Sequence, residues 1–216
     1  MSQNNTKKIA VVAANGRVGS PSLWRRPCAA GFDVTAIARE ESRTQAQHFL
    51  KGDALTIGRD QLEGFDAVVD AVGGWSEDTL HLIPDAAKHL ADALAGTEVR
   101  LVVVGGAGSL FVDPEHTVTL AQTPEFPDAF KGVAGAHQQA LDTLRGRDDV
   151  RWMYVSPAAD FQAEGERTGE YTLAGEELTP NAKGESTISY TDYAIALVDE
   201  VEPGEHIRER ISVVSK

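Results

Sequence analysis

Five short apolar runs constrain the fold of this chain more than any other feature. Each is rich in valine, isoleucine or alanine, and a turn with glycine or proline follows most of them. The runs are residues 9–14, 34–38, 67–72, 101–104 and 151–155. Continuous apolar runs, as opposed to alternating ones, are typical of strands buried on both faces of a parallel sheet. We therefore expect an α/β fold in which helices cover both faces of a mostly parallel sheet.

Three apolar stripes with helical spacing lie between or after these runs. The first contains Ala87, Leu90, Ala91 and Leu94, the second Ala136, Ala140, Leu141 and Leu144, and the third Ala194, Leu197, Val198 and Val201. Ser189 and Thr191 are candidate caps for the third helix, and Pro203-Gly204 ends it. A first crossover helix is expected over residues 18–30, but Pro27 lies within it and predicts a short or broken helix.

The size and charge of the chain narrow the classes of function. The chain has 216 residues, which is the length of one domain, so we expect a single domain over residues 1–216. Lys plus Arg total 20 and Asp plus Glu total 33, which gives a net charge of −13, so no nucleic acid is expected as a partner. No apolar run is long enough to span a membrane, no apolar leader is visible, and Cys28 has no second cysteine to pair with. We expect a cytoplasmic protein with no membrane partner.

Two long segments depart from the strand–helix pattern. Residues 109–131 carry three prolines and three phenylalanines, and residues 165–189 are polar except where Tyr171 and Leu173 alternate as in a strand. Both segments follow the carboxyl end of an expected strand, where open α/β sheets bind ligands. Long excursions from a compact domain are usually functional loops. Phe126 and Phe130 are therefore candidate contacts for a bound substrate ring, with anchoring of the loop to the core as the alternative.

The turn after the first run has the composition of a dinucleotide-binding turn. Its sequence, Ala13-Ala14-Asn15-Gly16-Arg17-Val18-Gly19, follows a strand and precedes an expected helix. Small residues let the backbone approach a pyrophosphate, and Gly16 and Gly19 meet that need. Ala13 stands where the first glycine usually lies, so an ordinary strand-to-helix turn is the alternative.

Arg39 follows the second run, at the position where NAD-binding proteins carry an acidic residue for the ribose 2′-hydroxyl. A guanidinium there can pair with a 2′-phosphate, which favours NADP(H) over NAD(H) as the cofactor. Glu40 and Glu41 come next and would oppose a phosphate if they turned inward. A solvated Arg-Glu loop is the alternative.

Together these features resemble the atypical short-chain dehydrogenases/reductases. Residues 8–12, 13–19, 34–39 and 52–53 resemble the N-terminal half of that family. The stretches VGGAGSL at 104–110, SPAA at 156–159 and GERTGEY at 165–171 look like the small NADH-flavin reductase-like proteins, relatives of NmrA-like proteins and biliverdin reductase B. The resemblance covers nearly the whole chain. It implies a single Rossmann-fold domain with a doubly wound, mostly parallel sheet that binds NAD(P)(H).

The resemblance also implies which residues contact the cofactor. Asn15, Gly16, Arg17 and Val18 would hold the pyrophosphate, with Ala13 in the same turn; Arg39 would hold the 2′-phosphate; Asp53 and Ala54 would border the adenine; Ala71, Val72 and Gly73 would line the ribose side; and Ser156, Pro157 and Ala158 would lie near the nicotinamide. Ala13 and the segment 20–29 depart from the family pattern, which bears on affinity more than on fold.

The chain lacks the Tyr-x-x-x-Lys pair through which classical short-chain dehydrogenases donate a proton. In the expected loop it has Phe130-Lys131-Gly132-Val133-Ala134 instead. Carbonyl reduction needs the tyrosine proton, whereas a flavin or quinone ring delocalises the charge and can take its proton from water. We therefore expect an NAD(P)H-dependent reductase of a small-molecule aromatic acceptor. A non-catalytic NADP(H)-binding redox sensor and a Rossmann remnant without a ligand are the alternatives.

Several single side chains carry weaker indications. Ser109 follows a glycine-rich strand end and is a candidate catalytic hydrogen-bond donor to a bound ring, with a turn cap as the alternative. His137 shares a helical face with leucines, which indicates a core residue. The other histidines lack metal-ligand spacing, so no metal is expected. Trp24 and Trp75 follow glycine turns. A position beside the cleft, packing in the core and a contact between subunits are the alternatives for these two residues. The sequence therefore leaves open whether the protein is a homodimer. The charged cluster at 205–210 indicates a solvated face.

Overall fold

The sheet that organises the fold has eight strands in the order β3-β2-β1-β4-β5-β6-β10-β8, in a computed structural model that describes residues 6–16, 31–41, 43–201 and 204–216. Its strands are β1 (Lys8–Val12), β2 (Asp33–Ala38), β3 (His48–Lys51), β4 (Ala67–Asp70), β5 (Arg100–Val104), β6 (Arg151–Ser156), β8 (Tyr171–Ala174) and β10 (Glu209–Ser215). Neighbouring strands pair in parallel except β10 and β8, which are antiparallel. Strands β7 (Asp160–Gln162) and β9 (Thr187–Ser189) form a separate parallel pair.

The strand order is that of a doubly wound sheet. From β1 the chain moves outward to β2 and β3, returns to β4 on the other side of β1, and then moves outward again through β5 and β6. The direction of winding therefore reverses between β1 and β4. This arrangement is the Rossmann fold that the sequence predicted.

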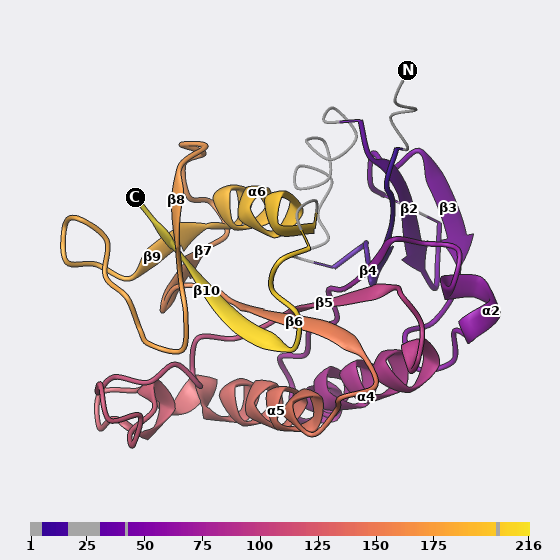
Figure 1. The fold of residues 1–216 in the computed structure, drawn as a ribbon. Coiled ribbons are helices and arrows are strands. Elements are labelled where there is room, and N and C mark those ends of the chain that lie inside the picture. Colours follow the sequence, from indigo (N-terminus) through magenta and orange to yellow (C-terminus); the bar gives the residue numbers. More distant parts are fainter. Residues whose placement is uncertain (1–5, 17–30, 42, 202–203) are drawn as a thin grey trace.

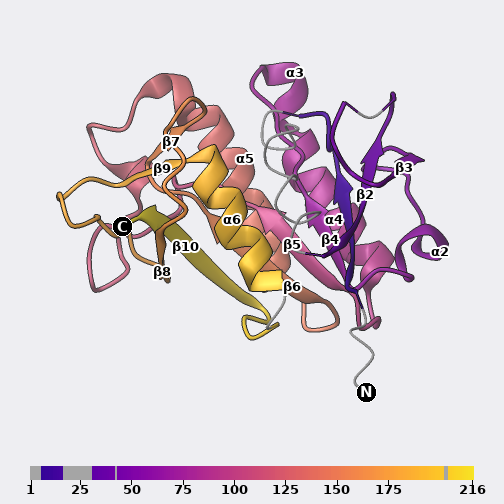
Figure 2. The same cartoon turned by 90° about the horizontal axis from the view of Figure 1, so that it is seen from above.

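Helices cover both faces of the sheet (Figure 1). Helices α4 (Leu82–Leu94) and α5 (Asp128–Arg145) lie beside each other on one face, and α6 (Tyr190–Val201) lies on the opposite face, as Figure 2 shows from above. The short elements are α2 (Arg59–Leu62), α3 (Glu77–Leu80) and the 3₁₀ turn η1 (Leu120–Gln122). Alternate residues of each central strand enter two separate cores. Val11 and Val69 face α6, while Val12 and Val68 face α4 and α5.

The five predicted strands and the three predicted helices are all present. Ser189 is the cap of α6, because its Oγ accepts a hydrogen bond from the amide of Asp192 at 3.0 Å. The strand-like alternation at Tyr171 and Leu173 corresponds to β8. The prediction of a loop over residues 109–131 was wrong at two places, because this segment contains η1 and the first residues of α5.

Four of the strands were not expected from the sequence: β3 and β10 in the main sheet, and the separate pair β7 and β9. The prediction that the cluster at 205–210 is a solvated face was wrong at Arg210. Arg210 lies in β10, and its side chain is fully buried. The run that follows it, residues 211–214, is buried because β10 pairs with β6 on one side and with β8 on the other.

The predicted first crossover helix, its Pro27 and the helix stop at Pro203 lie outside the described residues. Within the described part of the chain, no helix has the length and apolar character needed to cross a membrane.

Candidate functional site

A cavity of about 1230 Å³ runs along the carboxyl ends of the parallel strands. The turns after β1, β2, β4, β5 and β6 supply much of its wall. The predicted cofactor contacts that line it are Ala13, Asn15, Gly16, Arg39, Asp53, Ala54, Ala71, Val72, Gly73, Pro157 and Ala158. Arg17 and Val18 lie outside the described residues. The cavity spans the reversal between β1 and β4, which is where doubly wound sheets bind nucleotides.

The turn after β1 is held in an unusual backbone conformation. Ala13 has φ 58°, in the left-handed region that favours glycine, and this is the position where the sequence lacks the usual first glycine. The Gly16 amide donates to the Ala13 carbonyl at 2.9 Å and closes the turn. Gly16 itself does not have a positive φ; a Cβ built on it would lie 3.1 Å from the Ala13 oxygen. Gly16 is therefore constrained by space and not by a left-handed conformation.

Asn15 connects this turn to the loop that follows β2. Its side-chain Nδ2 donates to the Glu41 carbonyl at 3.0 Å, and its Oδ1 accepts from the Arg43 amide at 2.9 Å. These contacts use the oxygen of the Asn15 side-chain amide and one of its two N–H groups. Its role in the free protein is to fix the position of the loop that carries Arg39.

Charged groups gather at the end of the cavity beside β2. Arg39 lies with its Nε 3.8 Å from the Asp53 carboxylate, and 78% of its side chain is exposed. Glu40 also lines the cavity, and its carboxylate lies 3.7 Å from the Arg43 guanidinium. Arg43 thus offsets the charge of Glu40, the acid next to Arg39 in the sequence, and the Arg39 guanidinium is exposed to solvent although it lies near Asp53.

Bare backbone forms the wall of the cavity after β4 and β5. A Cβ on Gly73 would meet nothing within 4 Å, and Gly105 and Gly106 follow β5. A Cβ on Gly105 would lie 2.2 Å from the ring of Tyr154, which is fully buried on β6. Glycine is therefore needed at position 105 for packing beneath the cavity.

One face of α5 forms a further part of the wall, next to the glycines that follow β5. Phe130, Val133, Ala134 and His137 follow helical spacing and all line the cavity, with Phe126 just before the helix. Phe126 and Phe130 therefore lie where the sequence predicted contacts for an acceptor ring. The helical face that His137 shares with Leu141 and Leu144 predicted a core residue. Its spacing from Phe130 and Val133 was the signal that the same face also reaches the cavity.

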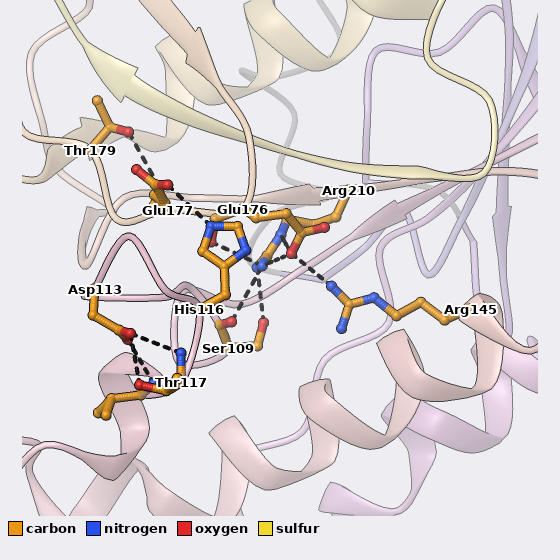
Figure 3. A network of polar contacts seen from close by, with 10 residues as sticks. Ser109, Asp113, His116, Thr117, Arg145, Glu176, Glu177, Thr179 and Arg210 are labelled. Carbon is orange, nitrogen blue, oxygen red and sulfur yellow. Dashed lines mark hydrogen bonds and ion pairs between the residues drawn. The ribbon is translucent and has the colours of Figure 1, made fainter.

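Ser109 and Ser156 occupy different places from those predicted. Neither lines the cavity, and both are buried. The Ser109 hydroxyl lies 3.3 Å from Nη1 of Arg210 (Figure 3). The Ser156 hydroxyl lies 3.5 Å from the same atom. These positions count against a hydrogen bond from Ser109 to a bound ring and against a direct cofactor contact by Ser156. Both serines instead help to satisfy a buried arginine.

A buried acid lies beneath the cavity at the end of β4. Asp70 is 2% exposed, and burial raises its pKa to about 7, against the smaller opposite effect of a 3.0 Å hydrogen bond from the Val72 amide. Between about pH 4 and pH 7, the Asp70 carboxyl therefore keeps its proton in the native protein and has lost it in the unfolded chain. The stability contributed by the protonated Asp70 carboxyl is therefore fully present below about pH 4 and is lost as the pH rises through about 7.

Asp70→Asn is expected to remove this pH dependence. At pH 8 the variant should be more stable than the wild type, by an amount on the order of a few kcal/mol, because no carboxylate has to be ionised in the core. The amide oxygen can still accept from Val72. Urea unfolding at pH 4.5 and pH 8 measures the difference. The same change in stability at both pH values would show that ionisation of Asp70 is not its cause.

The cavity fits a nicotinamide dinucleotide in two respects. Alanine and glycine at the strand ends leave backbone bare toward the cavity, as a pyrophosphate requires, and an exposed arginine stands at the end of β2. Within the described residues, no group of three or more His, Cys, Asp or Glu side chains could hold a metal ion. Fold and site together define a nucleotide-binding protein of the Rossmann class.

Comparison with known proteins identifies the family. Residues 13–202 match the family described as NAD(P)H-binding, and the chain belongs to that family. The uncharacterized protein YwnB of Bacillus subtilis (strain 168) is 41% identical over 212 residues, covering 97% of this chain and 99% of its own. The crystal structure of a "putative NADH-flavin reductase" from Streptococcus pneumoniae TIGR4 is 48% identical, with a TM-score of 0.94, and covers 97% of this chain and 100% of that one. The family predicted from the sequence is thereby confirmed.

Proposed function

We propose that this protein is an NAD(P)H-dependent reductase whose acceptor is a flat conjugated ring, such as a flavin or a quinone. The observation that carries the proposal is the composition of the cavity wall, which combines bare backbone at the strand ends with the aromatic rings of Phe126 and Phe130. The reduced nicotinamide would supply the hydride. The protein would contribute position, by placing two rings face to face in an enclosed space.

The α5 face supports a ring acceptor over an isolated carbonyl. The residues of α5 that line the cavity are Phe130, Val133, Ala134 and His137, and none of these is a tyrosine or a lysine. A carbonyl that receives hydride needs an acid that transfers a proton to its developing alkoxide, as the tyrosine of a Tyr-x-x-x-Lys pair does. A flavin or quinone spreads the charge over the ring, so this wall suits it better.

Oxidation of NADPH in the presence of FMN, FAD or a quinone tests the proposal. Turnover that saturates with both NADPH and the acceptor supports a reductase. Tight binding of NADPH without turnover on any of these acceptors would contradict it and would favour the redox sensor. Failure to bind either nicotinamide cofactor would contradict both.

NADPH is expected to bind about tenfold more tightly than NADH, because the exposed Arg39 guanidinium can pair with the 2′-phosphate. Arg39→Ala should remove this preference and leave NADH affinity nearly unchanged. Lys51→Ala is the matched control, because it removes the same charge from the end of the neighbouring strand β3, at an exposed position outside the cavity wall. Equal affinities for the two cofactors in the wild type, measured by calorimetric titration, would contradict the assignment of Arg39.

A further inference from the structure

His137 has a contact on each side of its imidazole ring. On the inner side, its Nδ1 lies 3.3 Å from the phenol oxygen of Tyr154. Gly106, at the end of β5, lies against the ring, since a Cβ built there would be 3.0 Å from Cγ and Cδ2 of the imidazole. The ring is therefore held between β5, β6 and its own helix, and it forms part of the cavity wall.

Tyr154 is fixed and cannot enter the cavity itself. Its side chain is fully buried, and its oxygen accepts a hydrogen bond from the Gly106 amide at 3.1 Å. The same oxygen lies 3.2 Å from the backbone carbonyl of His137. Burial raises the pKa of this phenol above its usual value, so it keeps its proton. Tyr154 is a positioning residue, and its one proton has two nearby acceptors on His137.

The other ring nitrogen of His137 faces the cavity. Among the described residues, Nε2 has no hydrogen-bond partner, and the sole side-chain nitrogen or oxygen that is sealed from solvent without one is Nε of Arg100. Since Nε2 is not sealed and His137 lines the cavity, this atom is open to the cavity. Burial lowers the pKa of His137 to about 4, so the ring is neutral near pH 7 and carries one N–H.

We propose that His137 carries this hydrogen on Nε2 and donates a hydrogen bond through it to the acceptor ring during reduction, while the Tyr154 hydroxyl donates a hydrogen bond to Nδ1. The choice of nitrogen follows from the acceptors available. The backbone carbonyl of His137 lies inside α5, where it already accepts the helical hydrogen bond from the backbone amide one turn further along the chain. Nδ1 has no second partner in the described structure, so the Tyr154 proton satisfies it and leaves the hydrogen at Nε2.

The chemical role of this N–H rests on the proposed reductase function. The acceptor gains a hydride from the reduced nicotinamide and one proton from water, so that atoms and charge balance. His137 keeps its own proton and stabilises the negative charge that is present on the ring before water protonates it. It is the hydrogen-bond donor on the α5 face, which has no Tyr-x-x-x-Lys pair.

Nuclear magnetic resonance of the ligand-free protein, labelled with ¹⁵N-histidine, tests the tautomer without any turnover. The His137 signals are identified by their absence in His137→Gln. A neutral ring with hydrogen on Nε2 from pH 5 to pH 8 is expected, and Tyr154→Phe should shift the ring toward a mixture of tautomers. Hydrogen on Nδ1 in the wild type, or protonation near pH 6.5, would overturn the proposal.

Three substitutions at the same position test the donor in catalysis. The amide of glutamine reaches about as far as Nε2, the amide of asparagine reaches about as far as Nδ1, and leucine has no donor. His137→Leu and His137→Asn should each lower kcat about 10- to 100-fold with an unchanged Kd for NADPH, and His137→Gln should retain part of the activity. His89→Gln is the control, because His89 is a part-buried histidine bonded to the Ile57 carbonyl and lies outside the cavity wall.

The outcomes separate this inference from the proposed function. Wild-type protein that binds no NADPH or reduces no acceptor contradicts the proposed function, whatever the tautomer. Wild-type turnover that persists in all three variants overturns the donor role of His137 and leaves the reductase intact. A loss in His137→Gln as large as that in His137→Leu would show that the ring acts by packing, which also overturns the donor role.

Discussion

Glu176→Ala is expected to destabilise the protein by about 3 kcal/mol, because it leaves the guanidinium of Arg210 buried without a carboxylate. The Arg210 side chain has no exposed surface. Its Nε donates to Oε2 of Glu176 at 2.9 Å, and Nη2 contacts both this oxygen and the Glu176 carbonyl (Figure 3). The Glu176 side chain is 32% exposed, so water can partly replace its carboxylate as a partner of Arg210 in the variant. The expected loss of stability therefore lies at the lower end of the range for broken buried ion pairs.

Glu177→Ala is the matched control for this change. Glu177 is the next residue along the chain, is 57% exposed and bonds His116 at the surface. Its removal should cost less than about 1 kcal/mol. Chemical denaturation at pH 7 measures both variants. Equal losses for Glu176→Ala and Glu177→Ala would contradict the importance assigned to the buried pair.

The same pair predicts a loss of stability in acid. Burial tends to raise the pKa of Glu176, but the hydrogen bonds and charge of Arg210, with Arg145 in addition, bring it below the usual 4.5. The carboxylate therefore contributes stability above pH 4.5, and this contribution is lost as the pH falls through the lower pKa of the folded state. Glu176→Ala should show a smaller loss of stability between pH 5 and pH 3 than the wild type does.

Gly16→Val is expected to lower the affinity for NADPH by about 10- to 100-fold. Gly16 is exposed in the turn after β1 and lines the cavity. Its Cβ would already lie 3.1 Å from the Ala13 carbonyl, and a branched side chain would extend into the space expected for a pyrophosphate. Because the turn is at the surface, the melting temperature should change little.

Ala13→Gly is the control in the same turn. Ala13 has φ 58°, and glycine adopts this conformation without the cost of about 1 kcal/mol that alanine incurs. The variant should therefore retain NADPH binding and gain stability. Calorimetric titration and thermal melting measure both effects. NADPH affinity that is unchanged in Gly16→Val would place the cofactor elsewhere.

The features that depend on short stretches of sequence were predictable. The five apolar runs correspond to five strands, because strands buried on both faces need continuous apolar sequence. Ser189 caps α6, because its hydroxyl oxygen accepts a hydrogen bond from a nearby backbone amide. The turns at the strand ends likewise follow from their glycines. Almost all the described residues that resemblance assigned to the cofactor line the cavity for this reason.

The features that were missed depend on contacts between distant parts of the chain. Arg210 looks solvated within its charged neighbourhood, and it is buried because Glu176 and Ser109, 34 and 101 residues away, supply its partners. Ser109 looked available for a ligand, and the same arginine occupies its hydroxyl. His137 looked like a core residue because its leucine neighbours along α5 are in the core, whereas the cavity begins one turn before them.

The central claim is that the cavity along the strand ends binds a reduced nicotinamide cofactor beside a ring acceptor. The most direct measurement is titration of the wild-type protein with NADPH, followed by NADPH oxidation with FMN and a quinone at the concentration that saturates the cofactor site. We expect one NADPH bound per chain and oxidation that depends on the acceptor. The absence of NADPH binding, or binding that persists in Gly16→Val with no oxidation on either acceptor, would contradict it.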